Sequence, residues 1–152
     1  MPSRPSPARE SSEFYERFAD VVRCVRTLSE DAYAAIDVGT AQAKFVRYIG
    51  EHGRISQAEL ARATRTAPTL TGRVLGALVA RGWVRRTRSR EDRREYVLEL
   101  TAAGQRVRAR VVEARSGAIA RLAGVLDDKD KRDFERIAAK ILGAFGEPAT
   151  RP

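Results

Sequence analysis

The sequence predicts a mainly helical α+β fold, in the order helix, helix, short helix, helix, hairpin, helix, helix. Apolar side chains recur at three- and four-residue steps over most of the chain, as in amphipathic helices. In the middle of the chain the period changes, and two β-favouring runs, 83–87 and 95–100, flank a polar loop over 88–94. Two helices joined by a short turn and followed by a charged hairpin form a winged helix-turn-helix, which we place at 54–100.

Composition favours a single folded domain. The chain has 152 residues, of which 43% are hydrophobic and 32% are charged, enough to bury a core. No apolar run approaches the ~20 residues that span a bilayer, and the N-terminus lacks the apolar stretch of a secretory signal. We therefore expect a cytoplasmic protein with no membrane partner.

Few residues are available for catalysis or metal binding. The single cysteine, Cys24, excludes an internal disulfide, and the single histidine, His52, argues against a zinc site or a histidine-assisted triad. No carboxylate pair stands isolated on an apolar face. We expect no enzyme activity, no metal and no cofactor.

The charge points instead to a polyanionic partner. The net charge is +9, and all but four of the 29 basic residues are arginine, which pairs bidentately with phosphate or guanine. A genome rich in G and C would also favour arginine over lysine, so the placement of the charge matters more than the ratio. From Arg81 to Arg94 seven arginines stand against two acidic residues, a local charge of +5 that suits DNA binding through counterion release.

Two helices are predicted before the motif. The first runs from Ser11 or Ser12 to about Ile36, and the second runs from Thr40 to about His52. The apolar stripe of the first consists of Phe14, Phe18, Val21, Val25 and Leu28. The inner side of the second consists of Ala41, Phe45, Tyr48 and Ile49.

The motif itself opens with a capping box. Ser56 and Glu59 form an S-x-x-E pattern that begins a short helix over 56–63. Pro68 fits the first turn of the next helix. The inward face of that helix is predicted to be Thr71, Val74, Leu75, Leu78 and Val79. Its outward face is predicted to be Thr69, Leu70, Gly72, Arg73 and Gly76.

Two more helices follow the hairpin. Thr101 caps a long one, and Asp127 or Asp128 caps the last. Their apolar positions are Val107, Val111, Ala118 and Leu122, then Phe134, Ile137, Ile141 and Phe145. The outer helices are too long and too apolar for one core to cover, which indicates a second copy of the chain. We expect one domain over 11–146, with dimerisation helices at 11–37 and 101–146, a winged lobe at 40–100, and disordered tails at 1–10 and 147–152.

Three motifs in this order point to a known family. The run Ser-Gln-Ala-Glu-Leu-Ala over 56–61 opens the short helix, and L-x-x-L-x-x-x-G-W-V over 75–84 leads into the hairpin. R-E-D-R-R over 90–94 then precedes V-x-L-x-L-T-x-x-G over 97–104. Their spacing resembles the MarR (multiple antibiotic resistance regulator) family of transcription factors, by motif over roughly 38–104 and by pattern only in the outer helices. The resemblance implies a homodimeric regulator, most often a repressor, that binds double-stranded DNA at a palindromic operator.

The start of the recognition helix carries the candidate base contacts. Arg73 is the only long outward donor there, so we predict guanine readout, with a phosphate contact as the alternative. Thr69 suits a phosphate or a base edge, and Leu70 suits a thymine methyl. The family usually has a capping residue where Ala67 stands, so the cap bond is either missing or moved to Thr66, which we also include among the DNA contacts.

Other DNA contacts are expected at helix starts and in the wing. Helix N-termini would bring Thr40, Ser56 and Gln57 to backbone phosphates, although capping alone explains Ser56. The resemblance implies that Asp92 braces Arg94, which enters the minor groove. The arginines suited to phosphates are Arg88, Arg90 and Arg93. The alternative for this loop is a solvated, disordered segment when DNA is absent.

Cys24 and His52 each have a functional and a structural interpretation. Cys24 is either a redox switch, as in some relatives, or a small buried apolar residue. His52 either complements the helix dipole or senses a ligand or pH. The resemblance implies a small aromatic or phenolic effector, for which Arg47 and Tyr48 are the candidates. The aromatic residues expected mostly in the core are Tyr15, Tyr33, Phe45, Tyr48 and Trp83.

Two classes of function fit these observations. The first is a sequence-specific transcriptional regulator, and the second is an architectural DNA- or RNA-binding protein that uses the basic wing without sequence preference. Resistance of the complex to competitor DNA separates the two. An enzyme would need a nucleophile and a base, and the sequence provides no such pair.

Overall fold

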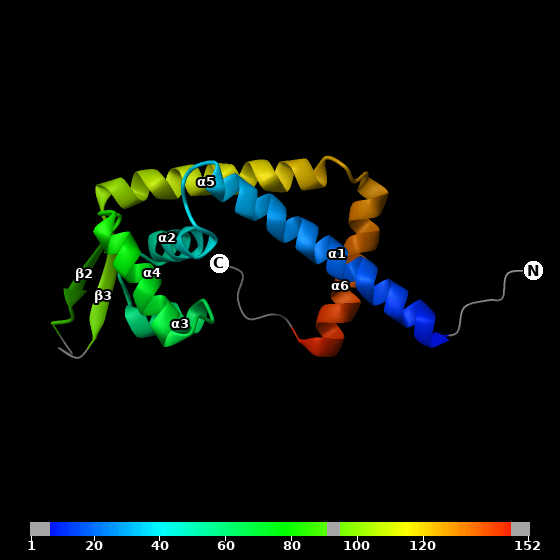
Figure 1. Ribbon diagram of the computed structural model, residues 1–152, viewed down its shortest axis with the longest axis horizontal. Coiled ribbons are helices and arrows are strands. Elements are labelled where there is room, and N and C mark those ends of the chain that lie inside the picture. The colour runs from blue at the N-terminus through cyan, green and yellow to red at the C-terminus, as the bar shows by residue number, and fades with distance from the viewer. Residues whose placement is uncertain (1–6, 91–94, 147–152) are drawn as a thin grey trace, which may run out of the picture.

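The computed structural model describes residues 7–90 and 95–146, which form a winged lobe with long helices extending from it (Figure 1). Over these residues the helices are α1 Pro7–Ala34, α2 Thr40–His52, α3 Gln57–Ala63, α4 Pro68–Ala80, α5 Ala102–Ala123 and α6 Asp128–Phe145. The strands are β1 Ile55–Ser56, β2 Val84–Arg88 and β3 Tyr96–Leu100. The predicted mainly helical winged helix-turn-helix is confirmed.

The lobe has its own apolar core, with α2 at its centre. The largest fully buried apolar side chains come from α2, α3, α4, β3 and α5, and they include Phe45, Ile49, Leu60, Leu75, Leu78, Leu98 and Val111. Burying one such side chain stabilises the fold by about 1.5–3 kcal/mol. The predicted inward face of α4 is confirmed except for Val79, which is exposed. Because each helical residue is turned about 100° from the last, Val79 lies at the border of the buried face.

The first helix starts earlier than predicted. α1 begins at Pro7, not at Ser11 or Ser12. Proline is tolerated in the first turn because the N–H that it lacks would have no partner in the helix. Arg9 in the added turn pairs with Glu13 one turn later, with Nε of Arg9 3.3 Å from Oε1 of Glu13. Part of the expected N-terminal tail is therefore helical.

The remaining helix ends follow local capping. α2 ends at Gly53, whose φ of 74° lies in the left-handed region that glycine adopts without strain. Thr101 caps α5 by accepting a bond from the N–H of Gly104 at 3.0 Å. Asp127, of the two predicted candidates, caps α6 by accepting from the N–H of Asp130 at 2.8 Å. These ends were predictable because each depends on residues within one turn of the helix.

The turn between α3 and α4 is held by hydrogen bonds of its own residues and by one from α2. The buried Thr64 donates its Oγ1 hydrogen to the carbonyl of Leu60 at 2.7 Å. Lys44 of α2 donates to the carbonyl of Thr64. Arg65, with a φ of 49°, then reverses the chain into α4. The turn that sets the angle between the two motif helices is thus anchored to the core helix.

The wing belongs to a three-stranded antiparallel sheet in the order β1-β3-β2. Arg86 lies opposite Leu98 and Arg88 opposite Tyr96, and both strands lie within one residue of the predicted runs. β1 adds a third strand, with Ile55 opposite Leu98. This strand was not predicted, because two residues are too short to display an alternating pattern.

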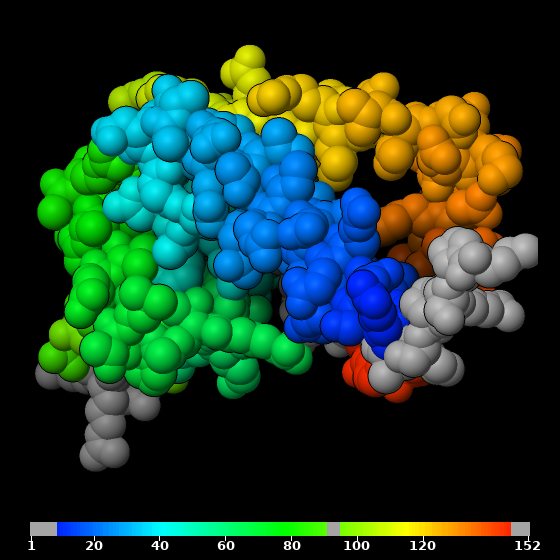
Figure 2. Space-filling view, turned by 45° about the vertical axis from the view of Figure 1, so that its right-hand side comes forward, coloured from blue at the N-terminus to red at the C-terminus, as the bar shows by residue number. Residues whose placement is uncertain are grey.

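α1, α5 and α6 extend beyond the lobe (Figure 2). α1 packs against α5, and over residues 9–34 of α1 only Tyr33, at its C-terminal end, is buried. The large apolar side chains exposed on α1 and α6 are Phe14, Tyr15, Phe18, Val21, Val22 and Val25, and Phe134, Ile137 and Phe145. In the described ranges, no helix is both long enough and apolar enough to cross a membrane.

Two residues of α1 that were expected to be buried are exposed. The side chain of Tyr15 is 67% exposed, and Cys24 is exposed as well. Both lie on the part of α1 that precedes its buried end, so the core does not reach them. The redox hypothesis for Cys24 stays a prediction. Among the other aromatic residues expected in the core, Tyr33, Phe45 and Tyr48 are buried and Trp83 is half-buried.

Candidate nucleic-acid interface

The outward face of α4 carries one long cationic side chain, that of Arg73, beside two glycines. Thr69, Leu70, Gly72, Arg73 and Gly76 are all exposed, as predicted. A Cβ atom built at Gly72 or Gly76 would meet no atom within 4 Å. Arg73 therefore projects beside open stretches of helix backbone, which leaves room for a partner to approach the helix closely.

The N-terminus of α4 has no side-chain cap. Ala67 is the N-cap residue and makes no capping bond. The Oγ1 of Thr66 bonds to Thr64 at 2.9 Å, and Thr71 donates to the carbonyl of Ala67 at 3.1 Å. Of the two alternatives expected from the sequence, the cap bond is missing and has not moved to Thr66. First-turn N–H groups without a side-chain acceptor are suited to binding a phosphate.

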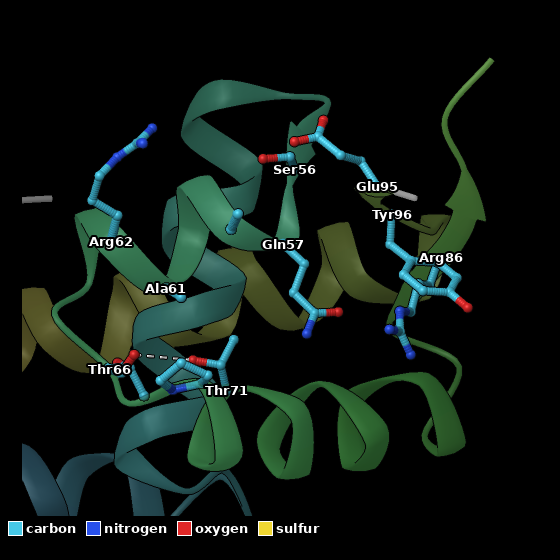
Figure 3. A pocket seen from close by; sticks show the side chains of 11 residues that line it. Ser56, Gln57, Ala61, Arg62, Thr66, Thr71, Arg86, Glu95 and Tyr96 are labelled. Atoms are coloured by element: carbon cyan, nitrogen blue, oxygen red, sulfur yellow. Dashed lines mark hydrogen bonds between the residues drawn. The ribbon is translucent and has the colours of Figure 1, made fainter. Parts of the chain in front are cut away.

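A groove of about 700 Å³ lies between α3, the start of α4 and the wing (Figure 3). It is lined by Ser56, Gln57, Ala58, Ala61, Arg62, Thr66, Pro68, Thr71, Arg86, Glu95 and Tyr96. Gln57 points from α3 into the groove, and its buried Oε1 has no hydrogen-bond partner among the described residues. Ser56 caps α3 by accepting from the N–H of Glu59 at 3.1 Å. Three predicted contacts, Ser56, Gln57 and Thr66, thus meet in one place.

The arginines of the basic run that lie on β2 alternate between the two faces of the sheet. On one face of β2 the guanidinium of Arg86 lies 3.6 Å from the ring centre of Tyr96, and that of Arg88 lies 4.6 Å from it. Such stacking fixes the orientation of an arginine without neutralising it. On the other face Arg85 pairs with Glu99 at 2.7 Å, and the hydrogen bond from Arg85 lowers the pKa of that carboxyl. Because strand side chains alternate, only part of the local charge of the run faces the groove.

The predicted wing-tip contacts lie mostly outside the described residues. Arg90 is exposed where the described part of the wing ends. Asp92, Arg93 and Arg94 belong to the segment that the structure does not describe, so their roles stay predictions.

Thr40 lies away from the reading end of α4. It is the first residue of α2, next to Gly39 and close in sequence to Gln42, to which Arg81 at the C-terminal end of α4 is bonded. A helix of this length places Thr69 roughly 18 Å from that end. The expected phosphate contact of Thr40 is therefore separate from the cluster around the groove.

The structure adds three groove residues that sequence reasoning missed, namely Arg62, Arg86 and Tyr96. Arg62 was overlooked because the short helix was interpreted only through its cap. Arg86 and Tyr96 belong to opposite strands, and only the pairing register brings them together. The alternation along β2 was the signal available, since it already places Arg86 and Arg88 on one face.

The candidate effector residues are not part of the groove. Arg47 and Tyr48 are buried on α2, at 8% and 7% exposure. His52 lies one turn later, with its Nδ1 2.9 Å from the carbonyl oxygen of Tyr48 and its ring stacked 4.0 Å from the Tyr48 ring. His52 thus occupies the last turn of α2, the position from which a cationic side chain would complement the helix dipole.

Comparison with known proteins shows which family this arrangement resembles. Residues 36–95 match the family model described as the MarR family. Over this segment the chain is similar to the MarR family. It is also 30% identical over 97 residues to the transcriptional repressor MprA of Escherichia coli, an alignment that covers 64% of this chain and 55% of that protein. The chain thus spans about half the length of the curated relatives that it matches.

Solved structures of the MarR family share the fold along nearly the whole chain. MarR from Escherichia coli in its apo form has a TM-score of 0.72 at 20% identity, covering 92% of this chain and 98% of its own. A mutant of the same protein complexed with operator DNA has a TM-score of 0.75 at 21% identity, covering 91% and 99%. A MarR-like transcription regulator from Bacillus cereus reaches 0.81 at 18% identity, covering 90% and 98%. The likeness extends to α1, α5 and α6, so these helices belong to the fold.

Proposed function

We propose that this chain belongs to the MarR family and is a sequence-specific, double-stranded DNA-binding transcriptional regulator, acting as a repressor. The observation that carries the proposal is the exposure of Arg73 on the outward face of α4, in a motif that also exposes Arg62 on α3 and Arg86 on β2. The motif thus offers a donor suited to reading a base and cations suited to phosphates. The relatives support the same function, since one is a transcriptional repressor and another was solved with operator DNA.

We further propose that the chain acts as a homodimer on a palindromic operator. Support comes from the apolar side chains on α1 and α6, among them Phe14 at 64% and Phe134 at 61% exposure. Patches of this kind on a folded protein mark interaction surfaces. A two-fold dimer would present two copies of α4 to half-sites about 34–36 Å apart.

Footprinting on DNA upstream of the protein's own gene, followed by binding in the presence of competitor DNA, tests the proposal. A specific regulator should bind its site roughly 10³–10⁷-fold more tightly than unrelated DNA. Equal affinity for all duplexes, or for RNA, would instead favour the architectural alternative.

The role of Arg73 has a separate test. Arg73→Ala should lose about 1–3 kcal/mol of discrimination at one base pair of each half-site. Arg73→Lys is the matched control, because it keeps the charge and loses the bidentate geometry. If Arg73→Ala binds with unchanged sequence preference, the arginine only contacts phosphate and the assignment is wrong.

The proposal also includes release by a small aromatic effector. The stacked rings of Tyr48 and His52 extend from the core to the surface at the end of α2, and this supports an aromatic ligand there. Adding a simple phenolic acid to the protein–operator complex should release the DNA, and Tyr48→Leu should abolish release. If no phenol in a panel releases the DNA from the unmodified protein, the effector proposal is wrong and the DNA-binding proposal is unaffected.

A further inference from the structure

Arg81, at the end of the recognition helix, reaches across to the turn between α1 and α2. It is the C-cap residue of α4. Its Nη1 donates to the carbonyl of Asp37 at 2.8 Å and to Oε1 of Gln42 at 3.4 Å, and its Nη2 pairs with the Asp37 carboxylate. The guanidinium also lies 4.2 Å from the ring centre of Trp83. Four groups from three segments of the chain therefore hold one side chain.

The acceptors that hold Arg81 are themselves fixed to helix ends. Asp37 has a φ of 57°, and its N–H donates to the carbonyl of Ala34, the last residue of α1, at 3.0 Å. Gln42 accepts a bond from the N–H of Gly39 at 3.0 Å, which caps the start of α2. Arg81 consequently joins the end of α4 to the end of α1 and to the start of α2.

We propose that Arg81 is a positioning residue that fixes the angle of α4 relative to α1 and so sets the half-site spacing that the dimer accepts. The inference rests on the proposed function, because α1 carries the apolar face assigned to the dimer and α4 carries Arg73. A change in the angle between these helices moves the two copies of α4 relative to each other. Half-site spacing depends on that separation, whereas the base preference assigned to Arg73 depends on contacts within one half-site.

A phosphate contact is the alternative role for an arginine in this basic run, and Asp37 distinguishes the two. If Arg81 binds phosphate, neutralising Asp37 frees the cation and tightens DNA binding. If Arg81 positions α4, neutralising Asp37 loosens the contact and weakens DNA binding. Asp37→Asn is the suitable variant because asparagine also tolerates the left-handed backbone.

The experiment compares the affinities of the unmodified protein, Arg81→Ala and Asp37→Asn for three forms of the operator. These are the natural operator, operators with the half-sites moved by one base pair in either direction, and an operator with one base changed inside a half-site. Asp133→Asn is the control, since it removes a carboxylate that pairs on the surface of α6 and changes the net charge equally. Melting curves establish that each variant is folded at the temperature used.

Both variants should bind the natural operator about 2- to 30-fold more weakly and lose most of their preference for its spacing. Their preference at the changed base and the salt dependence of binding should match the unmodified protein. Tighter binding by Asp37→Asn, or an Arg81→Ala variant that keeps its spacing preference while its salt slope falls by about 1, would overturn the inference. If Arg81→Ala does not fold, the sign of the Asp37→Asn effect decides alone. An unmodified protein with no preference for its operator would overturn the proposed function as well.

Discussion

The winged lobe and the two helices α1 and α6 have the same apolar periodicity, but their apolar side chains are buried in the lobe and mostly exposed on α1 and α6. Phe45 of α2 is fully buried, whereas Phe14 of α1 is 64% exposed and Phe145 of α6 is 87% exposed. All three belong to stripes with helical spacing. The spacing determines which side of a helix is apolar, but the neighbouring elements determine whether that side is covered. In the lobe α4, α5 and the sheet cover α2, while α1 and α6 leave most of their stripes exposed.

This difference separates the two tasks of the proposed regulator. The lobe carries α4, the groove and the wing on a core that one chain completes by itself. The outer helices carry the surface that would hold two lobes at a fixed distance. A change in the lobe should therefore affect stability or base recognition, and a change in the outer helices should affect assembly and the binding of two half-sites.

The largest effect is expected from a charge placed on the apolar face of α1. Phe18→Glu should separate the two copies, because a carboxylate in an apolar interface is strongly disfavoured. Binding of one lobe without the other would lower the affinity for a palindrome by on the order of 10²–10⁴-fold. Sedimentation measures the dissociation, and a gel shift measures the loss of affinity.

Thr27→Glu is the control for Phe18→Glu, because it adds the same charge on the opposite side of α1. It should leave assembly and DNA affinity unchanged. A dimeric Phe18→Glu variant with the affinity of the unmodified protein would show that α1 does not hold the two lobes together.

A second effect should appear where α5 joins the lobe. A Cβ atom at Gly104 would lie 2.0 Å from the carbonyl oxygen of Trp83, which also accepts a bond from the N–H of Thr101 at 3.0 Å. Backbone cannot move aside as a side chain can, so Gly104→Ala should destabilise the protein by about 1–3 kcal/mol.

Gly117, further along the same helix, gives the matched comparison. A Cβ atom there meets nothing within 4 Å. Gly117→Ala should raise the stability by about 0.5–1 kcal/mol, because alanine is the better helix former. Thermal or urea unfolding of both variants measures the contrast, and equal effects of the two substitutions would contradict this account of the junction.

Features that depend on neighbouring residues in the sequence were predicted well. The caps at Ser56 and Thr101 and the end of α2 at Gly53 follow from residue types within one helical turn. The exposed face of α4 follows from its period. For the same reason the sequence predicted the elements and their order with few errors.

Features that depend on contacts between distant segments were missed. Asp37 and Arg81 are 44 residues apart, and no periodic pattern links them. Arg85 and Arg86 look equivalent in the sequence, yet one pairs with Glu99 and the other stacks on Tyr96. Partners of this kind are set by strand register and helix packing, which the sequence does not display locally.

A third effect separates stability from DNA binding within the lobe. Gly76→Ala should stabilise the free protein by about 0.5–1 kcal/mol, since it removes a flexible residue from an exposed stretch of helix. It should also weaken operator binding by a factor of a few, because the added methyl group occupies the open surface beside Arg73. Gly143→Ala in α6, which is equally unobstructed, should bring the stability gain alone. Unchanged operator affinity of Gly76→Ala would mean that DNA does not approach this face of α4.

The smallest effect concerns one surface ion pair in each region. The pKa of Glu99 in the lobe is lowered from 4.5, mainly by the hydrogen bond from Arg85. The pKa of Asp133 on α6 is lowered from 3.8, mainly by the hydrogen bond from Lys129 and then by that from Arg136. A carboxyl group whose pKa is lower in the folded state contributes stability that is complete above its unfolded pKa and disappears as the pH falls through its folded pKa.

Glu99→Gln and Asp133→Asn should therefore lower the melting temperature slightly at pH 7, and each difference should vanish in acid. The difference in melting temperature between Glu99→Gln and the unmodified protein should begin to shrink near pH 4.5, the ordinary pKa of glutamate. The difference for Asp133→Asn should begin to shrink near pH 3.8, the ordinary pKa of aspartate. Both pairs are exposed to solvent, so salt should reduce both effects. Melting curves from pH 2 to 7 at low and high salt measure this. A difference that persists at the lowest pH would mean that the substitution acts through packing and not through the charge of the carboxylate.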